Sequence, residues 1–280
     1  MGQHGPMLTA TARRAEDLIT AKTRRDAAAP VPRRSLGAET ARWGRTVALR
    51  VPALRELAPY NKARGVNEDD LPHLDAISAF FSDAGIVPTL EVWAGDAGDR
   101  LGAALARRGL YAGTVTATLH ADLDGPRPTA PGRGRVTVEE LAADDDDPHY
   151  LATLVAGYGL AGARPERLAV LRAEHDPAAV RRYLARVDGR PAAAAGLYLG
   201  PDGALLGGAA TLPRFRRHGC QSALIARRLA DAGPHTDLAV VTVAYGSASH
   251  ANLERAGFRQ THTRTAWRPL HPACGGRGRW

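Results

Sequence analysis

Residues 205–229 read LLGGAATLPRFRRHGCQSALIARRL, and this stretch decides the fold of the chain. An apolar run that ends near Thr211 predicts a β-strand, a turn follows at Pro213, and from Gln221 the apolar residues recur at helical spacing. The turn carries four basic or potentially basic side chains and one glycine, without an acidic residue. Backbone N–H groups that open a helix bind anions, because they lack intrahelical partners and lie at the positive end of the helix dipole. The stretch therefore predicts an anion site that suits a pyrophosphate.

Two other phosphate motifs do not fit this turn. A Walker loop needs a second glycine and a lysine before serine or threonine, and a dinucleotide fingerprint needs three glycines. A surface turn with an exposed basic cluster is the alternative interpretation of the segment.

The flanking sequence predicts alternating strands and helices. Two turn signals in tandem, Asp188-Gly189 and Pro201-Asp202-Gly203, indicate three antiparallel strands that lead into the basic turn. Asp70 is expected to cap a helix. We expect helices over residues 8–28, 71–84, 101–108, 148–160, 221–232 and 252–256, and strands over residues 89–93, 115–119, 136–138, 183–187, 192–199, 204–212 and 238–244.

An internal repeat connects two parts of the chain. The segment LARRGLY at 105–111 matches LERAGFR at 253–259, and the same offset of 148 places the strand ending at Trp93 on the one ending at Val241. Two unrelated helix ends of a common type are the alternative. The expected organisation is an N-terminal helix and linker over 1–45, a first unit over 46–123, a proline- and glycine-rich linker over 124–134, a second unit over 135–270 and a basic tail over 271–280.

The order of motifs over roughly residues 134–268 resembles the acyl-CoA signature of the GNAT-type N-acetyltransferases. The elements that carry the resemblance are the strand before Pro213, Arg216-x-x-Gly219, Ser222-Ala223-Leu224, the strand 238–244, Ser247-x-Ser249-x-x-Asn252, Gly257-Phe258 and Thr263-Arg264. The resemblance implies a mixed α/β (α+β) three-layer fold with two GNAT-like domains, each a central mixed, mostly antiparallel sheet flanked by helices. The first half lacks an Arg-x-x-Gly loop, which implies a tandem protein whose N-terminal copy is degenerate.

The resemblance further implies an N-acyltransferase that moves an acetyl or other acyl group from acyl-CoA to an amine of a small molecule or peptide by direct attack. The pyrophosphate would lie on the amides of residues 217–222, and the pantetheine arm along residues 210–212, between two strands that splay apart. A backbone N–H there would stabilise the oxyanion, and Asn252 would contact the cofactor. The implied acyl-CoA residues are Ala210, Thr211, Leu212, Arg216, Arg217, His218, Gly219, Cys220, Gln221, Ser222 and Asn252.

Two positions depart from the family pattern. Gln221 stands where the motif ends in glycine or alanine, and Leu253 stands where many members carry the tyrosine that protonates the departing thiolate. Leucine cannot donate a proton, so Tyr245, Ser249 or His250 serves instead, or water does, or the reaction is not ordinary acetyl transfer. No carboxylate lies on strand 204–212 to act as a base.

These departures keep two other functions open. One is a non-catalytic CoA-binding sensor or scaffold protein, and the other is a GNAT fold repurposed for other small-molecule chemistry in a biosynthetic pathway. Cys220 near the helix start could be nucleophilic, but we expect it to pack as a small apolar side chain. His218 is expected to contact phosphate or solvent and not to act as a base. The ten histidines show no ligand pairing, so no metal is expected.

The charge distribution argues against a nucleic-acid-binding protein. The net charge is +8, but residues 1–45 contribute +5 and residues 262–280 contribute +4, which leaves −1 for residues 46–261. We expect the basic ends to be disordered solubilising tails. The 35 arginines among 37 basic residues indicate a GC-rich bacterial genome. Two cysteines, no apolar leader and no membrane-length apolar run predict a cytoplasmic protein without a membrane partner, and the sequence leaves room for a homodimer.

Overall fold

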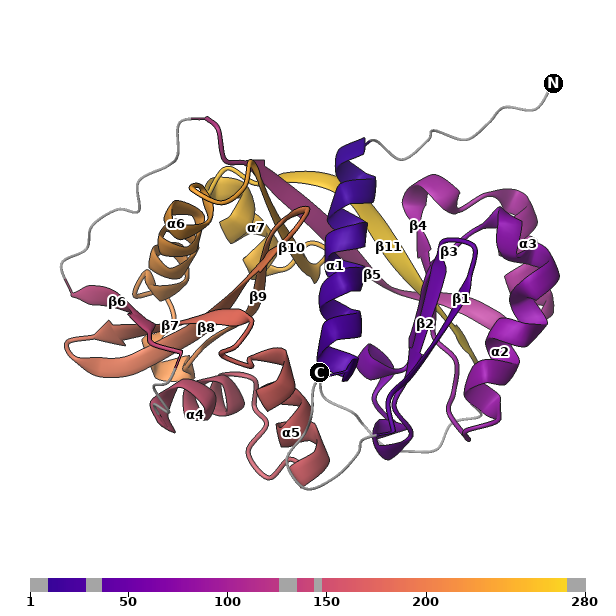
Figure 1. The fold of residues 1–280 in the computed structure, drawn as a ribbon, viewed down its shortest axis with the longest axis horizontal. Helices are drawn as coiled ribbons and strands as arrows, with labels where there is room; N and C mark the ends of the chain where they lie inside the picture. Colours follow the sequence, from indigo (N-terminus) through magenta and orange to yellow (C-terminus); the bar gives the residue numbers. More distant parts are fainter. Residues whose placement is uncertain (1–9, 29–36, 126–134, 144–147, 271–280) are drawn as a thin grey trace. The chain divides into compact units, whose positions relative to one another are not determined.

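The computed structural model describes residues 10–28, 37–125, 135–143 and 148–270 (Figure 1). Its contacts divide the described chain into unit 1, residues 37–115 and 264–270, and unit 2, which holds the rest. The boundaries fall inside strands β5 (Leu110–Asp122) and β11 (Arg259–Pro269) and not in the expected linker, most of which lies outside the described residues together with the tail at 271–280. The helix at the N-terminus belongs to unit 2.

Unit 2 is built on a sheet whose strands are antiparallel at every junction except β9–β10. The Asp188-Gly189 turn joins β7 to β8 with positive φ at both residues, 49° and 75°, which is the backbone that a two-residue hairpin of this type requires. The hydrogen-bonded order is β5-β10-β9-β8-β7-β6, with β6 (Val136–Leu141), β7 (Val180–Val187), β8 (Arg190–Gly200), β9 (Gly203–Thr211), β10 (Leu238–Ala244) and residues 116–122 of β5.

Helices cover both faces of this sheet, because successive strand residues point to opposite sides. Tyr183 and Ala185 pack in the core beneath α6 (Cys220–Ala232) and α7 (Ala248–Arg255), whereas Leu184 between them packs against α4 (Pro148–Gly157) and α5 (Pro165–Glu174). Helix α1 (Ala10–Ala28) places Leu18 against Leu238 and Val240 on the side of α4 and α5. Figure 1 shows α6 beside α7 and α4 beside α5.

The basic N-terminal end is therefore in part folded, contrary to the expected disordered tail. Arg14 of α1 donates to the carboxylate of Asp237 at 3.0 Å, and Arg25 donates to that of Asp176 at 2.6 Å. These ion pairs hold α1 against the segments that precede strands β10 and β7. Two arginines that we expected in a solubilising tail therefore contribute to the fold of unit 2. Residues 1–9 and 29–36 lie outside the described residues.

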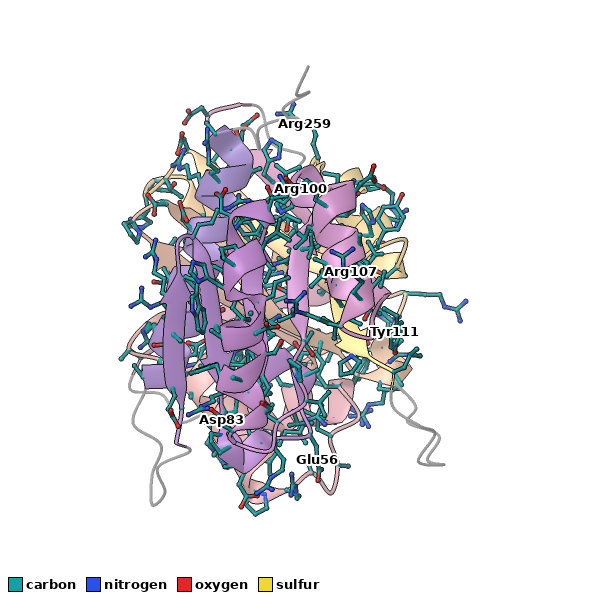
Figure 2. The ribbon with its side chains drawn as sticks, turned by 90° about the vertical axis from the view of Figure 1, so that its right-hand side faces the viewer. Glu56, Asp83, Arg100, Arg107, Tyr111 and Arg259 are labelled. Atoms are coloured by element: carbon teal, nitrogen blue, oxygen red, sulfur yellow. The ribbon has the colours of Figure 1, made fainter. Side chains whose placement is uncertain are left out.

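Unit 1 is a smaller sheet with the order β1-β2-β3-β4-β11. Its elements are β1 (Glu39–Trp43), β2 (Thr46–Arg50), β3 (Lys62–Val66), β4 (Leu90–Trp93), residues 264–269 of β11, helices α2 (Leu74–Ser82) and α3 (Asp99–Arg107), and short 3-10 helices at Pro52–Leu54, Ala58–Tyr60, Glu68–His73 and Ala94–Asp96. Arg107 at the end of α3 and Tyr111 just after it lie at the surface (Figure 2). The expected cap at Asp70 needs correction, since Asn67 is the N-cap and Asp70 is its capping-box partner.

The two units repeat the same order of elements. An offset of 148 residues places Leu90 of β4 on Leu238 of β10, and α3 on α7. In both units a helix connects two parallel neighbouring strands, β3 to β4 through α2 and β9 to β10 through α6. The mixed, mostly antiparallel sheet flanked by helices that we expected is confirmed. No helix in the described part of the chain is long and apolar enough to cross a bilayer, and the cytoplasmic location stays a prediction.

Candidate functional site: the loop before α6

Strands β9 and β10 separate after a short paired segment. Only Ala204 with Ala239 and Leu205 with Val240 are in register, although β9 continues to Thr211 and β10 to Ala244. The β8–β9 register also shifts between Gly207 and Ala210, and Gly208 has a φ of +52° there. This bulge turns β9 away from its neighbour. Beyond Leu205 and Val240 the two parallel strands are no longer paired, which opens the sheet in unit 2.

The loop from Arg216 to Gly219 brings backbone amides to the start of α6. Gly219, the N-cap, has a φ of +88°, and Arg217 has a φ of +65°, which is uncommon for a residue with a side chain. Left-handed residues in such a turn orient neighbouring N–H groups toward a common point, as in anion-binding nests. The first turn of α6 contains no acidic residue. The loop can therefore hold a di-anionic group at the helix N-terminus.

This loop and the separated strand line one cavity of about 720 Å³. Its volume lies in the range of small-molecule and cofactor sites. No carboxylate is among the residues that line it. They are Gly157, Tyr158, Ala209, Ala210, Thr211, Phe215, Arg216, Arg217, Gly219, Cys220, Gln221, Ser222, Leu224, Ala248, Ser249 and Asn252. Nine of the eleven expected acyl-CoA residues thus meet here, drawn from β9, the loop before α6, α6 itself and α7.

The other two expected residues are not among those that line this cavity. Leu212 lines a second cavity of about 590 Å³ between α4 and the start of β8, with Arg190 and Arg214 among its other lining residues. His218 is exposed, and its Nδ1 lies 3.0 Å from the carbonyl oxygen of Arg216.

Gln221 faces α7 and bridges it to the loop. Its side-chain N–H donates to the Ser249 hydroxyl at 3.3 Å, and its carbonyl oxygen accepts from the Asn252 amide. The larger side chain at this position is therefore accommodated by polar groups of α7. Cys220 is buried beside it with its sulfur 3.9 Å from the Phe215 carbonyl oxygen, and burial raises the pKa of its thiol. A thiol in this environment packs as an apolar group.

The three candidates for the missing proton donor occupy different environments. Ser249 lines the cavity, whereas Tyr245 and His250 are not among its lining residues. Tyr245 is 58% exposed. His250 is buried, and its Nδ1 accepts from the backbone N–H of Gly246 at 3.1 Å, so it closes the turn after β10. Leu253 is buried in the core beneath α7.

Sequence reasoning missed a buried polar group around the β9 bulge. The Arg228 guanidinium donates to the carbonyl oxygens of Gly196 at 3.1 Å and Gly207 at 3.5 Å. His175 packs against Gly208, where a Cβ atom would lie 2.0 Å from the imidazole, and its Nδ1 hydrogen-bonds with the Tyr150 hydroxyl at 2.7 Å. The only signal in the sequence was the pair Gly207-Gly208 in a strand, since glycine in a strand is typical of a bulge or of the close approach of another group to the backbone.

The corresponding loop of unit 1 has the opposite charge. At the offset of 148 residues, Arg216 and Arg217 correspond to Glu68 and Asp69. The amides of that turn already have partners, since the Asp69 N–H donates to the Asn67 side chain and the Asn67 N–H donates to the Asp70 carboxylate, both at 3.0 Å. Acidic side chains and amides that already have partners disfavour a phosphate group at this turn of unit 1.

No family model and no curated protein matches the sequence. Among solved structures, a GCN5-related N-acetyltransferase from Kribbella flavida is similar over 94% of this chain and 96% of its own, with a TM-score of 0.64 and 19% identity. Another from Sphaerobacter thermophilus is similar over 80% of this chain and 79% of its own, with a TM-score of 0.59 and 12% identity. A tandem GNAT protein from the clavulanic acid biosynthesis pathway is similar over 80% and 81%, with a TM-score of 0.55 and 16% identity.

At these identities the likeness concerns the fold. The chain has the fold of the GCN5-related N-acetyltransferases, and its similarity extends to a protein with two such domains. The resemblance that the motifs indicated is confirmed at this level. Among the described residues, no group of three or more His, Cys, Asp or Glu side chains is arranged to hold a metal ion.

Proposed function

We propose that unit 2 binds an acyl-CoA, with acetyl-CoA as the first candidate, and transfers the acyl group to an amine of a small molecule or peptide. The observation that supports this most is the cavity in which the α6 N-terminus, two arginines and the separated edge of β9 meet. A pyrophosphate needs the first two, and an extended amide-containing arm needs a free strand edge. Unit 1 would not bind a cofactor, because the corresponding loop carries Glu68 and Asp69 in place of the two arginines.

The proposed reaction depends on positioning. Arg216, Arg217 and the amides of residues 217–222 would hold the pyrophosphate, and residues 209–211 would align the pantetheine arm. A backbone N–H at the bulge of β9 would polarise the thioester carbonyl and stabilise the oxyanion. The acceptor amine would then attack the carbonyl carbon directly, and the thiolate would leave with a proton.

Calorimetric titration with acetyl-CoA tests the cofactor. We expect the wild type to bind acetyl-CoA and Gly219→Glu to bind it much more weakly. A Cβ added at residue 219 would meet no atom within 4 Å, so the glutamate fits, but its carboxylate would repel the phosphates. Gly219→Ala is the matched control, since it carries the same strain of a positive φ without the charge. If Gly219→Ala loses as much affinity as Gly219→Glu, charge is not the cause. A wild type that does not bind acetyl-CoA refutes the proposal.

A second function is favoured by Leu253, whose side chain fills the core where many relatives would place a proton donor. A non-catalytic CoA sensor or scaffold would need the loop but no such donor. Thiol release with a panel of amines separates the two functions. Acetyl-CoA binding without any thiol release favours the sensor, and amine-dependent release favours the enzyme.

A further inference from the structure

Tyr158 directly follows helix α4 and lines the same cavity as the loop before α6. We propose that the Tyr158 hydroxyl donates the proton to the sulfur of the departing CoA, in place of a donor on α7. This inference rests on the acyl-transfer function proposed above and assigns one of its catalytic groups.

The position of Tyr158 is set by a close approach of α4 to β9. A Cβ atom at Gly157 would lie 2.7 Å from the Cβ of Ala210 and 3.4 Å from the backbone nitrogen of Thr211. The helix end therefore rests on the strand segment that would align the pantetheine arm. The next residue, Tyr158, is 43% exposed and contributes to the cavity wall together with Ala209 and Ala210.

The hydroxyl of Tyr158 is available for proton transfer. Three tyrosines interact electrostatically with the buried guanidinium of Arg228. Two of them have a partner, since the Tyr150 hydroxyl hydrogen-bonds with His175 at 2.7 Å and the Tyr183 hydroxyl donates to Asp231 at 2.9 Å. Within the described residues, no hydrogen bond engages the third, that of Tyr158.

The environment of this hydroxyl keeps it protonated at neutral pH. Desolvation of the hydroxyl in the cavity wall, and then the Glu174 carboxylate, raise the pKa of Tyr158 above its ordinary value, so the hydroxyl carries its proton before the reaction. The positive charge of Arg228 acts in the opposite direction and stabilises the tyrosinate that is left after transfer. Arg228 stays in place because it is buried and donates to carbonyl oxygens of both strands at the bulge.

The step balances without another reagent. The amine lone pair forms the C–N bond at the thioester carbonyl carbon, and the C–S bond breaks with its electron pair passing to sulfur. Sulfur takes the proton of the Tyr158 hydroxyl. The nitrogen, which became positively charged on attack, loses one proton, and that proton restores Tyr158 directly or through water.

Tyr158→Phe tests the assignment, with Tyr111→Phe as control. Tyr111 is an exposed tyrosine of unit 1 that lies outside the cavity residues, so the control removes a hydroxyl without touching the site (Figure 2). We expect Tyr158→Phe to lower kcat for amine-dependent thiol release by about 100-fold, as loss of a general acid does. The Kd for acetyl-CoA and the thermal unfolding midpoint should stay those of the wild type, and Tyr111→Phe should change none of these values.

Each other result overturns the assignment. An unchanged kcat in Tyr158→Phe, or a loss confined to Ser249→Ala, refutes Tyr158 as the donor while the acyltransferase function stands. If Tyr158→Phe loses affinity for acetyl-CoA, the Tyr158 hydroxyl binds the cofactor, and its assignment as the proton donor is refuted. A wild type that binds acetyl-CoA but releases no thiol refutes both the donor and the enzyme, and a wild type that does not bind it refutes the proposed function itself.

Discussion

Gly157 of α4 contacts Ala210 of β9 so closely that a Cβ atom at residue 157 would lie 2.7 Å from the alanine Cβ. That Cβ is bonded directly to the strand backbone, and the next two neighbours are backbone atoms of Ala210 and Thr211, so none of them can move aside as a flexible side chain would. This contact holds the end of α4 against the strand where β9 has left β10, and it forms one wall of the cavity.

We predict that Gly157→Ala pushes α4 away from β9. The added methyl group should lower the free energy of unfolding by about 1–3 kcal/mol and weaken acetyl-CoA binding. Gly102→Ala in helix α3 is the matched control, because no atom lies within 4 Å of its Cβ position. There, alanine should be neutral or stabilise the helix by about 0.5–1 kcal/mol. Chemical denaturation and calorimetry measure both effects, and equal stability of the two variants would contradict the prediction.

Removal of the buried guanidinium should destabilise the bulge. Arg228→Met leaves the carbonyl oxygens of Gly196 and Gly207 without this donor, at a cost of about 1–3 kcal/mol in unfolding free energy. Arg227→Met is the control on the preceding residue. The Arg227 side chain is 40% exposed and pairs with Asp231, so its loss should cost only about 0–1 kcal/mol in unfolding free energy. Urea denaturation compares the two, and a larger loss in Arg227→Met would show that the carbonyl contacts are not stabilising.

His175 should make folding sensitive to mild acid. Burial lowers the pKa of His175 from its ordinary 6.5 to about 3, and the charges of Lys22 and Arg182 add to this. The unfolded chain therefore binds a proton that the folded chain does not, and stability present above pH 6.5 is lost as the pH falls toward 3. Each unit of pH in that window removes about 1.4 kcal/mol per proton.

His175→Gln tests this by removing the titrating group. We expect the difference in unfolding free energy between wild type and His175→Gln to shrink as the pH falls below about 6.5. His235→Gln, at an exposed histidine, is the matched control. A difference that stays constant with pH would assign the titration to other groups.

Asp26 of α1 should act in the opposite direction. Burial raises the pKa of Asp26 to about 6, although Lys22 and Arg25 favour its charged form. The folded chain then binds this proton more tightly than the unfolded chain, so the stability that the protonated carboxyl contributes is present at low pH and lost as the pH rises through about 6. Denaturation of Asp26→Asn from about pH 4 to pH 7 should lack this loss. Asp124→Asn, at an exposed carboxylate, is the matched control.

Local sequence patterns predicted the elements near the site well. The strand expected over 238–244 has these bounds, and the helix expected over 221–232 begins one residue earlier, because alternation and helical spacing are properties of the segment itself. Strands β1, β2 and β3 were missed, since they are short and their neighbours determine their pairing. The expected unit boundaries were drawn between consecutive segments of the chain. In the structure, α1 packs in unit 2, and β5 and β11 are each divided between the two units, because contacts between residues far apart in the sequence define the units.

The sequence by itself determined the loop chemistry: basic side chains, one glycine at the start of an amphipathic helix, and no acid. Tertiary structure decided what this loop faces. The separation of β9 from β10, the burial of Leu253 and the placement of Tyr158 beside Ala210 all depend on packing between segments that are distant in the chain. A backbone turn is specified by a few adjacent residues, but a cavity exists only where several elements leave space between them.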